Sequence, residues 1–509
     1  MLWPLMLLTI VSTDATTKVA PSPNILIAIS DDQSYPHTSA YGSKMVHTPS
    51  FDRVARAGVL FTRAFAPSPG CSPSRAALLT GRFPWQLESA GTHASDFPAK
   101  YATFPSQLEA AGYSIGFTGK GWGPGNWRIS GRKQNPAGPE FNRRKLAVDS
   151  QANGAADDDY PENFADFLKG RPKGQPFCFW FGAHEPHRPF VSGAGVKSGK
   201  QLKIAEVPPF LPDCPEVRKD LLDYALEIES FDQQLGRMLD QLKELGELDN
   251  TIVIVTSDNG MSFPRAKANC YEFGIHVPLA IQWPTRVPGG RVVDDLASFV
   301  DLTATILEAA GITAVADATK SVAVPGRSLL PLLTSGGSGV LEPNRQFVYS
   351  ARERHSSARF ENAGYPQRAI RSRDYLYVRN FEPDRWPAGD PQELLRNGSL
   401  GPMHAAYYDI DRSPSLAFLV NHREDPATKM YFQGAVAKRP TEEFFDIRND
   451  SACLTNLVNS PAHAGPFAEH RLALERFLKE TGDPRVGPRG SVFETYPRFS
   501  PIRSFPKPK

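Results

Sequence analysis

Short apolar runs alternate with amphipathic stretches through the first two-thirds of the chain. Apolar residues at three- and four-residue spacing over 215–245 predict a long helix, and shorter helices are expected over 48–58 and 106–111. Four apolar runs fit buried strands: 24–30, 114–118, 177–181 and 251–255. Strands that alternate with helices indicate an α/β fold, with a largely parallel sheet covered by helices on both faces.

The last third of the chain has a different pattern. Shorter strand-like runs at 375–378 and 443–447 are separated by loops rich in proline and glycine, and a helix is expected over 462–480. This pattern favours a smaller α+β domain. The expected organisation is a signal peptide (1–20), a large domain (21–365), a small domain (366–484) and an extended, basic, proline-rich and poorly packed tail (485–509).

The N-terminus carries an apolar run, 2–11, that is too short to span a bilayer and is followed by small polar residues. It fits the hydrophobic region of a secretory signal peptide, with a frayed N-terminus as the alternative. No later stretch is apolar enough to span a membrane. We therefore expect a secreted or periplasmic protein without a membrane span.

Composition narrows the class of protein. The 57 Lys and Arg residues against 55 Asp and Glu leave a net charge of +2, and hydrophobic residues make up 40%. These values argue against a disordered chain and against a dedicated nucleic-acid binder. Five cysteines form no C-x-x-C pair, which argues against zinc, and their odd number leaves at least one thiol without an internal partner.

At least one residue with a polar side chain follows each of the four predicted strands of the large domain. In order, the residues are Asp31 and Asp32, Gly119 and Lys120, His184 and His187, and Asp258 and Asn259. In open α/β sheets, ligands bind at the carboxyl ends of the strands. Any one of these residues also fits a helix cap or a turn, but the four sets together indicate a functional site.

The residue types point to a cation and an anionic substrate. Lys120, His187 and Lys267 are donors for anionic oxygens. Four other residues have side-chain oxygens as metal ligands: Asp31, Asp32, Asp258 and Asn259. Such oxygen ligands favour calcium or magnesium over zinc. Three clustered carboxylates would repel one another without a cation. This combination suits an oxyanion ester as substrate.

A candidate nucleophile lies in the segment 70–81. Pro73 and Gly81 mark the first turn and the end of a short helix, which places Cys71 at a helix N-terminus where an anion is favoured. A buried structural cysteine is the alternative.

Residues 71–81 match the C-x-P-S-R and L-T-G signature of the type I, formylglycine-dependent sulfatases. Asp31-Asp32, Gly119-Lys120, 186–189 and 258–260 follow in the order of that family, and the resemblance covers about residues 22–484. It implies the alkaline-phosphatase-like fold: a large mixed sheet sandwiched by helices, with a smaller C-terminal domain built on an antiparallel sheet.

The resemblance also implies a chemistry for the site. A modifying enzyme would convert Cys71 to formylglycine; one hydroxyl of its hydrate, activated by one Ca²⁺, would attack sulfur, and the other would expel sulfate. Arg75 would stabilise the diol, and Lys120, His187 and Lys267 would bind the sulfate and assist the leaving group. The implied metal ligands are Asp31, Asp32, Cys71 as formylglycine, Asp258 and Asn259.

One position departs from the family. Many members carry a histidine two residues after the lysine, where this chain has Trp122. Either another residue such as His184 takes over deprotonation, or sulfate release works differently. The replacement is also expected to change the wall beside the sulfate.

Residues 257–271 and 183–188 are similar to the heparan N-sulfatase subgroup. This likeness implies a sulfated saccharide, N-sulfoglucosamine of the heparan type, cleaved from a chain end. His184 and His355 are expected to contact it, with a surface polar cluster as the alternative for His355. Three other functions stay open: O-sulfate hydrolysis on another polysaccharide, phosphate or phosphonate monoester hydrolysis, and non-catalytic glycan binding.

Overall fold

The computed structural model describes residues 22–146, 156–313 and 325–508. The expected signal peptide, 1–20, lies outside these ranges. Within them, no helix combines the length and apolar character needed to cross a membrane.

The large domain is built on one mixed sheet with the strand order β3-β4-β1-β5-β6-β2-β7, in which β8 also pairs with β2. The strands are β1 (Asn24–Ser30), β2 (Val59–Phe65), β3 (Ser114–Gly119), β4 (Phe177–Gly182), β5 (Thr251–Ser257), β6 (His276–Gln282), β7 (Arg291–Val293) and β8 (Ala297–Ser298). β1 is parallel to β4 and β5, but β6 is antiparallel to β5 and β2. The sheet is therefore less uniformly parallel than the apolar pattern suggested, because a buried antiparallel strand has the same apolar run as a parallel one.

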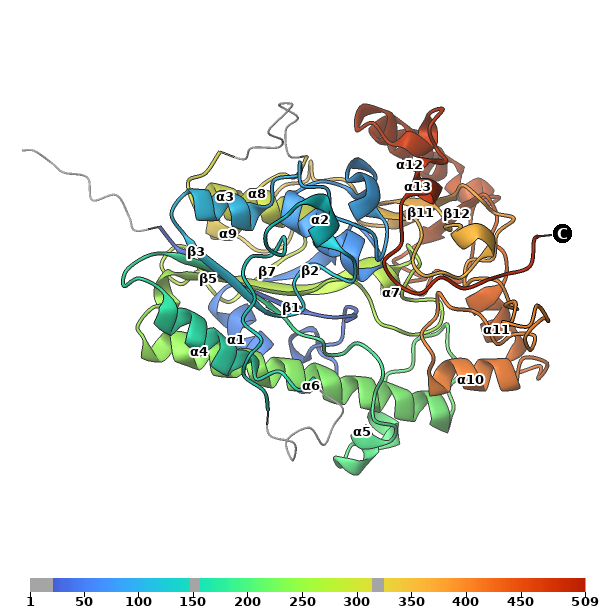
Figure 1. Ribbon diagram of the computed structural model, residues 1–509, viewed down its shortest axis with the longest axis horizontal. Coiled ribbons are helices and arrows are strands. Elements are labelled where there is room, and N and C mark those ends of the chain that lie inside the picture. Colours follow the sequence, from blue (N-terminus) through green and yellow to red (C-terminus); the bar gives the residue numbers. More distant parts are fainter. Residues whose placement is uncertain (1–21, 147–155, 314–324, 509) are drawn as a thin grey trace, which may run out of the picture.

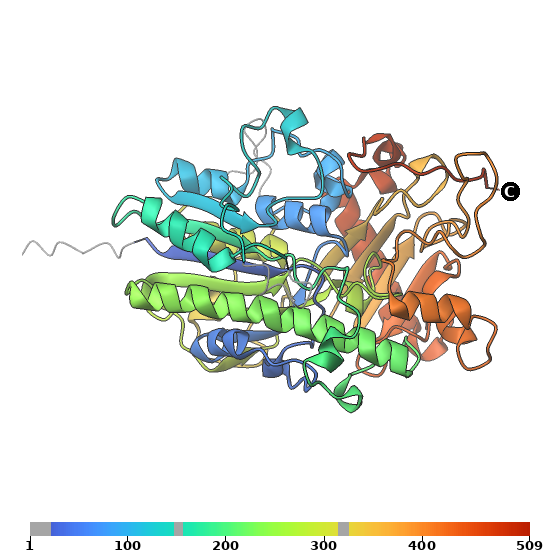
Figure 2. The same ribbon diagram turned by 60° about the horizontal axis from the view of Figure 1, so that its bottom comes forward.

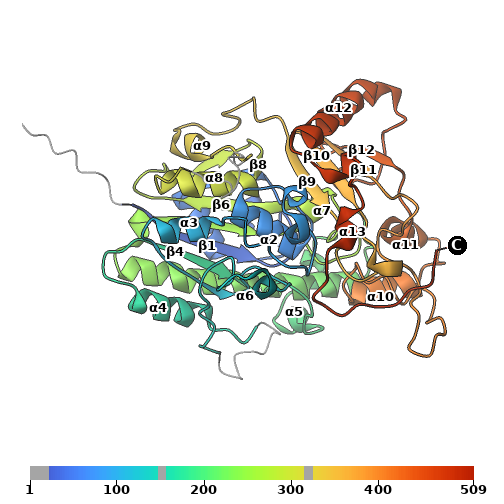
Figure 3. The ribbon, with the colours of Figure 1, turned by 45° about the horizontal axis from the view of Figure 1, so that its top comes forward.

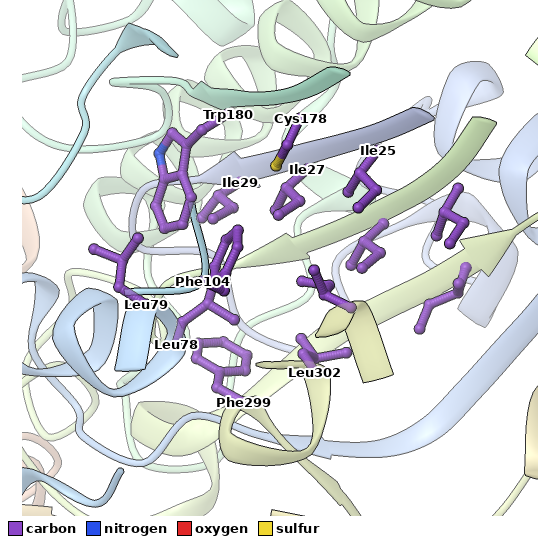
Figure 4. Packing of buried hydrophobic residues seen from close by; sticks show 14 of the residues in the cluster. Ile25, Ile27, Ile29, Leu78, Leu79, Phe104, Cys178, Trp180, Phe299 and Leu302 are labelled. Atoms are coloured by element: carbon purple, nitrogen blue, oxygen red, sulfur yellow. The ribbon is translucent and has the colours of Figure 1, made fainter. Parts of the chain in front are cut away.

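Helices cover both faces of this sheet (Figure 1). One face packs against α2 (Cys71–Thr80), α3 (Phe104–Ala110) and α8 (Phe299–Ala309), the other against α1 (Pro49–Ala57), α4 (Tyr160–Gly170) and α6 (Pro215–Glu244). Ile25, Ile27 and Ile29 point to the first face, where Figure 4 shows them in one packed cluster with Leu78 and Phe104. Leu26 and Ala28 join the cluster on the other face. Burial on both faces explains the continuous apolar sequence of β1.

The long helix α6 crosses the molecule and reaches the C-terminal region (Figure 2, green). There its apolar residues join one buried cluster with α10 (Pro414–Asn421) and α11 (Lys429–Val436). Three further helices are short: α5 (Ala194–Lys197), α7 (Glu272–Ile275) and α9 (Leu330–Thr334). The large domain and the C-terminal region therefore share a hydrophobic core and are not joined by a loose linker alone.

The second sheet is antiparallel, with the order β12-β11-β10-β9. Its strands are β9 (Val348–Arg352), β10 (Gln367–Arg371), β11 (Tyr375–Asn380) and β12 (Glu442–Asp446), and α12 (Ala464–Glu480) covers one face. The opposite face packs against Phe65 and Ile275 of the large domain. These two sheets confirm the expected fold class. The small sheet begins at Val348, before the expected boundary at 365, because β9 pairs with β10 across an intervening loop that carries no boundary signal.

The expectation of a poorly packed C-terminal tail is wrong. Phe493, in α13 (Val492–Thr495), and Phe505 are 2% and 3% exposed. Arg485 forms ion pairs with Glu353 at 2.6 Å and with Glu494 at 2.9 Å. Figure 3 shows the segment, in dark red, passing from α13 along the junction of the two domains. Buried aromatic anchors and paired charges override the composition, which alone resembles a linker.

Candidate active site

The carboxyl ends of β1, β3, β4 and β5 meet at one edge of the large sheet. The register aligns Ser30 with Ser257 and Gly119 with Gly182 at the last paired positions of these strands. The polar residues that follow each strand therefore start from neighbouring points, as the sequence pattern predicted.

Three carboxylates and one thiol form the centre of the site. The ligand atoms of Asp31, Asp32, Cys71 and Asp258 all lie within 4.8 Å of one another, and each residue is at most 1% exposed. Asn259 joins them by donating from Nδ2 to Oδ1 of Asp32 at 2.7 Å. The backbone N–H of Asp32 donates to Oδ1 of Asp258 at 3.1 Å. Five of the predicted residues thus share one buried cluster.

Cys71 is the first residue of α2, as the positions of Pro73 and Gly81 indicated. Its Sγ lies 3.3 Å from Oδ1 of Asp31 and 3.8 Å from Oδ1 of Asp32. Burial, with Asp31 beside it, raises the pKa of the Cys71 thiol well above its usual range. A neutral thiol is a weak nucleophile, so the unmodified side chain is poorly suited to attack a substrate.

Each of three cations takes a different carboxylate. Nε of Arg75 lies 2.7 Å from Oδ2 of Asp258. Nζ of Lys120 lies 2.5 Å from Oδ2 of Asp31, and Nζ of Lys267 lies 2.6 Å from Oδ2 of Asp32. Each carboxylate of the cluster is therefore paired with its own cation.

The site remains short of positive charge around Asp258. Burial opposes ionisation of Asp31, but Lys120 and the other cations hold the pKa of its carboxyl well below the usual range. Burial and the charge of Asp31 raise the pKa of Asp258 to about 7, against the effect of Arg75. A divalent cation among these groups would offset the repulsion between them.

The residues present fit a hard cation. Oδ1 of Asn259 is buried and has no hydrogen-bond partner among the described residues, and the same holds for Nη2 of Arg75. An unpartnered amide oxygen beside three carboxylates is a donor set for calcium or magnesium, since both prefer oxygen ligands. Cys71 and His187 also lie within ligand distance of Asp31, but one thiol and one imidazole fall short of the Cys₄, Cys₃His or Cys₂His₂ sets of structural zinc sites.

The site opens to solvent beside His187 and His184. The side chain of His187 is 36% exposed, and its Nε2 lies 3.9 Å from Oδ2 of Asp32. Its Nδ1 is 2.6 Å from the carbonyl of Arg188; because a carbonyl only accepts, Nδ1 carries a proton and Nε2 faces the cluster. His184 is 47% exposed and lies 3.9 Å from Asp158, on the flank of the site.

Trp122 belongs to the core rather than to the wall of the site. It is 3% exposed, and its ring packs edge-on against Phe97 at 5.2 Å. Its indole N–H donates to the carbonyl of Ser72 at 3.0 Å. Trp122 therefore supports the first turn of α2 and does not form the wall that we expected from the sequence.

Two further residues of the site, Asp411 and His93, were not predicted from the sequence. Asp411 places Oδ2 3.3 Å from Nζ of Lys267. The ring of His93 lies 4.5 Å from the ring of His355, which is 8% exposed, and a Cβ atom placed on Gly70 would lie 3.0 Å from Nδ1 of His355. Burial lowers the pKa of His355 to about 3, so this histidine is neutral at ordinary pH. Asp411 and His93 lie in loops without any periodic or motif signal.

Comparison with known proteins identifies the family. A family model described as Sulfatase matches residues 23–312. Human N-sulphoglucosamine sulphohydrolase is 28% identical over 517 residues, covering 92% of this chain and 93% of that protein. N-acetylglucosamine-6-O-sulfatase of Bacteroides thetaiotaomicron is 26% identical over 472 residues, covering 73% and 82%.

Solved structures agree on the fold. A protein solved in complex with its substrate D-glucosamine-2-N,6-O-disulfate superimposes with a TM-score of 0.64 at 19% identity, covering 91% of this chain and 98% of that one. A 2-O glycosaminoglycan sulfatase gives a TM-score of 0.59 at 20% identity, covering 91% and 93%. Since the family model spans more than half of the sequence, the chain belongs to the Sulfatase family.

Proposed function

We propose that the chain is a calcium-dependent sulfatase that removes sulfate from N-sulfoglucosamine at the end of a heparan-type saccharide. The observation that carries the proposal is the buried cluster of Asp31, Asp32, Cys71 and Asp258 with three cations around it. The substrate class is supported by the human relative, an N-sulphoglucosamine sulphohydrolase, and by the structural relative solved with a glucosamine disulfate.

Four side chains would hold the calcium ion: Asp31, Asp32, Asp258 and Asn259. With Cys71 converted to formylglycine by a modifying enzyme, the hydrated aldehyde would supply the attacking hydroxyl, and bound calcium would act there as a Lewis acid. The burial of Cys71 at the first turn of α2 keeps this position fixed against the carboxylates.

The cations of the site are arranged to bind sulfate. Lys120 and Lys267 are held by different carboxylates, Asp31 and Asp32, so two separate ammonium groups lie at the centre. Charge-assisted hydrogen bonds from both would orient the sulfate oxygens and stabilise negative charge that develops on them. Arg75, buried and fixed on Asp258, would keep a positive charge beneath the nucleophile.

His187 is placed to move a proton. Its Nδ1–H is engaged by the carbonyl of Arg188, which leaves Nε2 facing the cluster, 3.9 Å from Oδ2 of Asp32. In its imidazolium form, with a proton on Nε2 as well as on Nδ1, His187 would protonate the leaving oxygen or nitrogen of the sugar. We expected His184 to act as the base in place of a histidine at position 122. Because it lies 3.9 Å from Asp158 on the flank of the site, we assign it a role at the rim rather than beside Cys71.

The same proposal includes export. The N-terminal signal peptide would direct the protein to the periplasm or the medium, where sulfated polysaccharides are encountered. N-terminal sequencing of the secreted protein should find a start near residue 21, whereas a retained Met1 would contradict export by cleavage.

A panel of defined saccharides tests the substrate. We expect sulfate release from N-sulfoglucosamine to exceed release from 2-O-, 4-O- and 6-O-sulfated sugars, with a phosphate monoester assayed beside them. A clear preference for an O-sulfated sugar, without N-sulfate cleavage, would overturn the substrate and leave sulfatase activity intact. Cleavage of the phosphate alone would contradict sulfatase activity.

A further inference from the structure

The C-terminal segment 496–505 is fastened to two loops that border the site. The backbone N–H of Phe499 donates to the carbonyl of Ala94 at 2.7 Å. Nη1 of Arg498 donates to the carbonyl of His355 at 3.0 Å, and the backbone N–H of Arg503 donates to Oγ of Ser357 at 2.9 Å. The segment therefore ties the loop around residue 94 to the loop 355–357.

These loops carry the histidine pair next to the nucleophile position. His355 packs on Gly70, which directly precedes Cys71, and His93 packs on His355. Nδ1 of His93 is buried and has no hydrogen-bond partner within the described ranges. Arg498 is thus separated from the nucleophile position only by the His355 loop and Gly70.

The charge of Arg498 is uncompensated. Nε of its half-buried guanidinium has no hydrogen-bond partner, and no described carboxylate forms an ion pair with it. The nearby carboxylate of Asp409 is already engaged by Arg352 and Arg359, both at 2.7 Å. In the same C-terminal region, by contrast, Arg485 is paired with Glu353. A partly desolvated arginine without a carboxylate is costly unless it meets an anion.

Arg354 reinforces this surplus of positive charge. It is 3% exposed and donates to the carbonyls of Tyr496 and Pro497, at 2.8 and 2.9 Å, and to Oγ of Ser95 at 3.0 Å. None of these acceptors carries a charge. The junction of the segment with the two loops therefore holds two arginines, Arg354 and Arg498, that form no ion pair with a described carboxylate.

We propose that Arg498 binds an anionic group, a carboxylate or a sulfate, on the sugar that adjoins the one losing its sulfate. This subsite rests on the proposed function, because it assumes a saccharide held with its sulfated end at Cys71. It makes the C-terminal segment a specificity-determining wall of the cleft: a chain with an anionic second sugar gains a charge-assisted hydrogen bond that a single sugar cannot make.

Binding to the Cys71→Ala variant tests the subsite without turnover. The probes for calorimetric titration are N-sulfoglucosamine, its disaccharide with a uronic acid, the same disaccharide with the carboxyl group reduced to an alcohol, and a disaccharide whose second sugar carries sulfate. We expect one anionic disaccharide to bind about ten- to a hundredfold more tightly than the reduced one. Arg498→Ala and Arg498→Gln, added to this background, should abolish that advantage, and Arg498→Lys should restore part of it.

Arg489→Ala is the matched control, because Arg489 is exposed in the same C-terminal region and forms no ion pair with a described residue. It should keep the full advantage. The disaccharide whose affinity falls in the Arg498 variants identifies the group that Arg498 binds, either the carboxylate or the sulfate of the second sugar. Equal affinity for all the disaccharides, equal weakening of the single sugar by Arg498→Gln, or no binding of any probe would overturn the subsite. An Arg498-dependent advantage in a protein that releases no sulfate would instead reject the proposed hydrolysis alone.

Discussion

The indole N–H of Trp122 donates a 3.0 Å hydrogen bond to the backbone carbonyl of Ser72, the residue that follows Cys71. The ring fills a closed space: a Cβ atom on Gly125 would lie only 2.5 Å from it. Trp122 is thus part of the packing that holds the first turn of α2.

Trp122→Phe and Trp122→His separate packing from chemistry. The phenylalanine variant loses the hydrogen bond and should lower the free energy of unfolding by about 1 kcal/mol while retaining sulfate release. The histidine variant also loses aromatic volume and should lower that free energy by about 3 kcal/mol without gaining activity. Urea unfolding and sulfate release measure both effects. A histidine variant that works faster than the wild type would show that position 122 still belongs to the catalytic chemistry.

Much of the large domain follows from local pattern. The apolar runs of β1, β4 and β5 and the helical spacing of α6 occur where they were predicted, because burial on both faces of the sheet demands apolar residues at consecutive positions. The sequence did not indicate that β6 runs antiparallel to β5. It also did not indicate that the five-residue strand β9 belongs to the small sheet, because no domain-boundary signal precedes it.

Some residues of the candidate site could be predicted from the sequence, and others could not. Residues that follow strands, such as Asp31 and Asp258, could be predicted because parallel strands bring their ends to one edge. Asp411 and His93 could not, since only the packing of the small sheet and the loop at 93 brings them to Lys267 and His355. The packing of the C-terminal segment could not be predicted either, because the residues that anchor it are single aromatic residues among prolines and form no periodic pattern.

Chelation tests the cation. The oxygen ligands of Asp31, Asp32, Asp258 and Asn259 should bind calcium, so exhaustive chelation should stop sulfate release and added calcium should restore it. Magnesium is expected to restore less, because it demands near-ideal octahedral geometry. The same titrations followed by thermal unfolding should show calcium raising Tm. Recovery with zinc alone would contradict this set of ligands.

Lys267→Met removes one cation of the proposed sulfate site. Its ammonium group is 2.6 Å from Asp32 and 5% exposed, so we expect sulfate release to fall by at least about a hundredfold. Tm should also fall, because Asp32 loses its partner. Lys243→Met, an exposed position at the end of α6, is the control and should change neither. Unchanged sulfate release in the Lys267 variant would remove this lysine from the mechanism.

Glu227 gives the fold a pH dependence. Burial, with Glu185 and Asp223 nearby, raises the pKa of Glu227 to about 8 in α6, against an unfolded value near 4.5. The folded state therefore binds the proton more tightly, and this group's stabilising effect is present below the unfolded pKa and is lost as pH rises toward 8. Glu227→Gln should raise Tm relative to the wild type at pH 7.5 more than at pH 5. Glu244→Gln, at an exposed position of the same helix, should show no such pH-dependent difference; equal Tm shifts at both pH values in the Glu227 variant would show that its carboxyl is not held protonated.

The most direct test of a sulfatase centred on Cys71 is sulfate release measured by ion chromatography, with calcium present, for the wild type and Cys71→Ala in parallel. The buried position of Cys71 among Asp31, Asp32 and Asp258 predicts release by the wild type, with mass spectrometry finding formylglycine in the Cys71 peptide. The alanine variant should keep its Tm and release no sulfate. Equal sulfate release by both proteins would contradict the account.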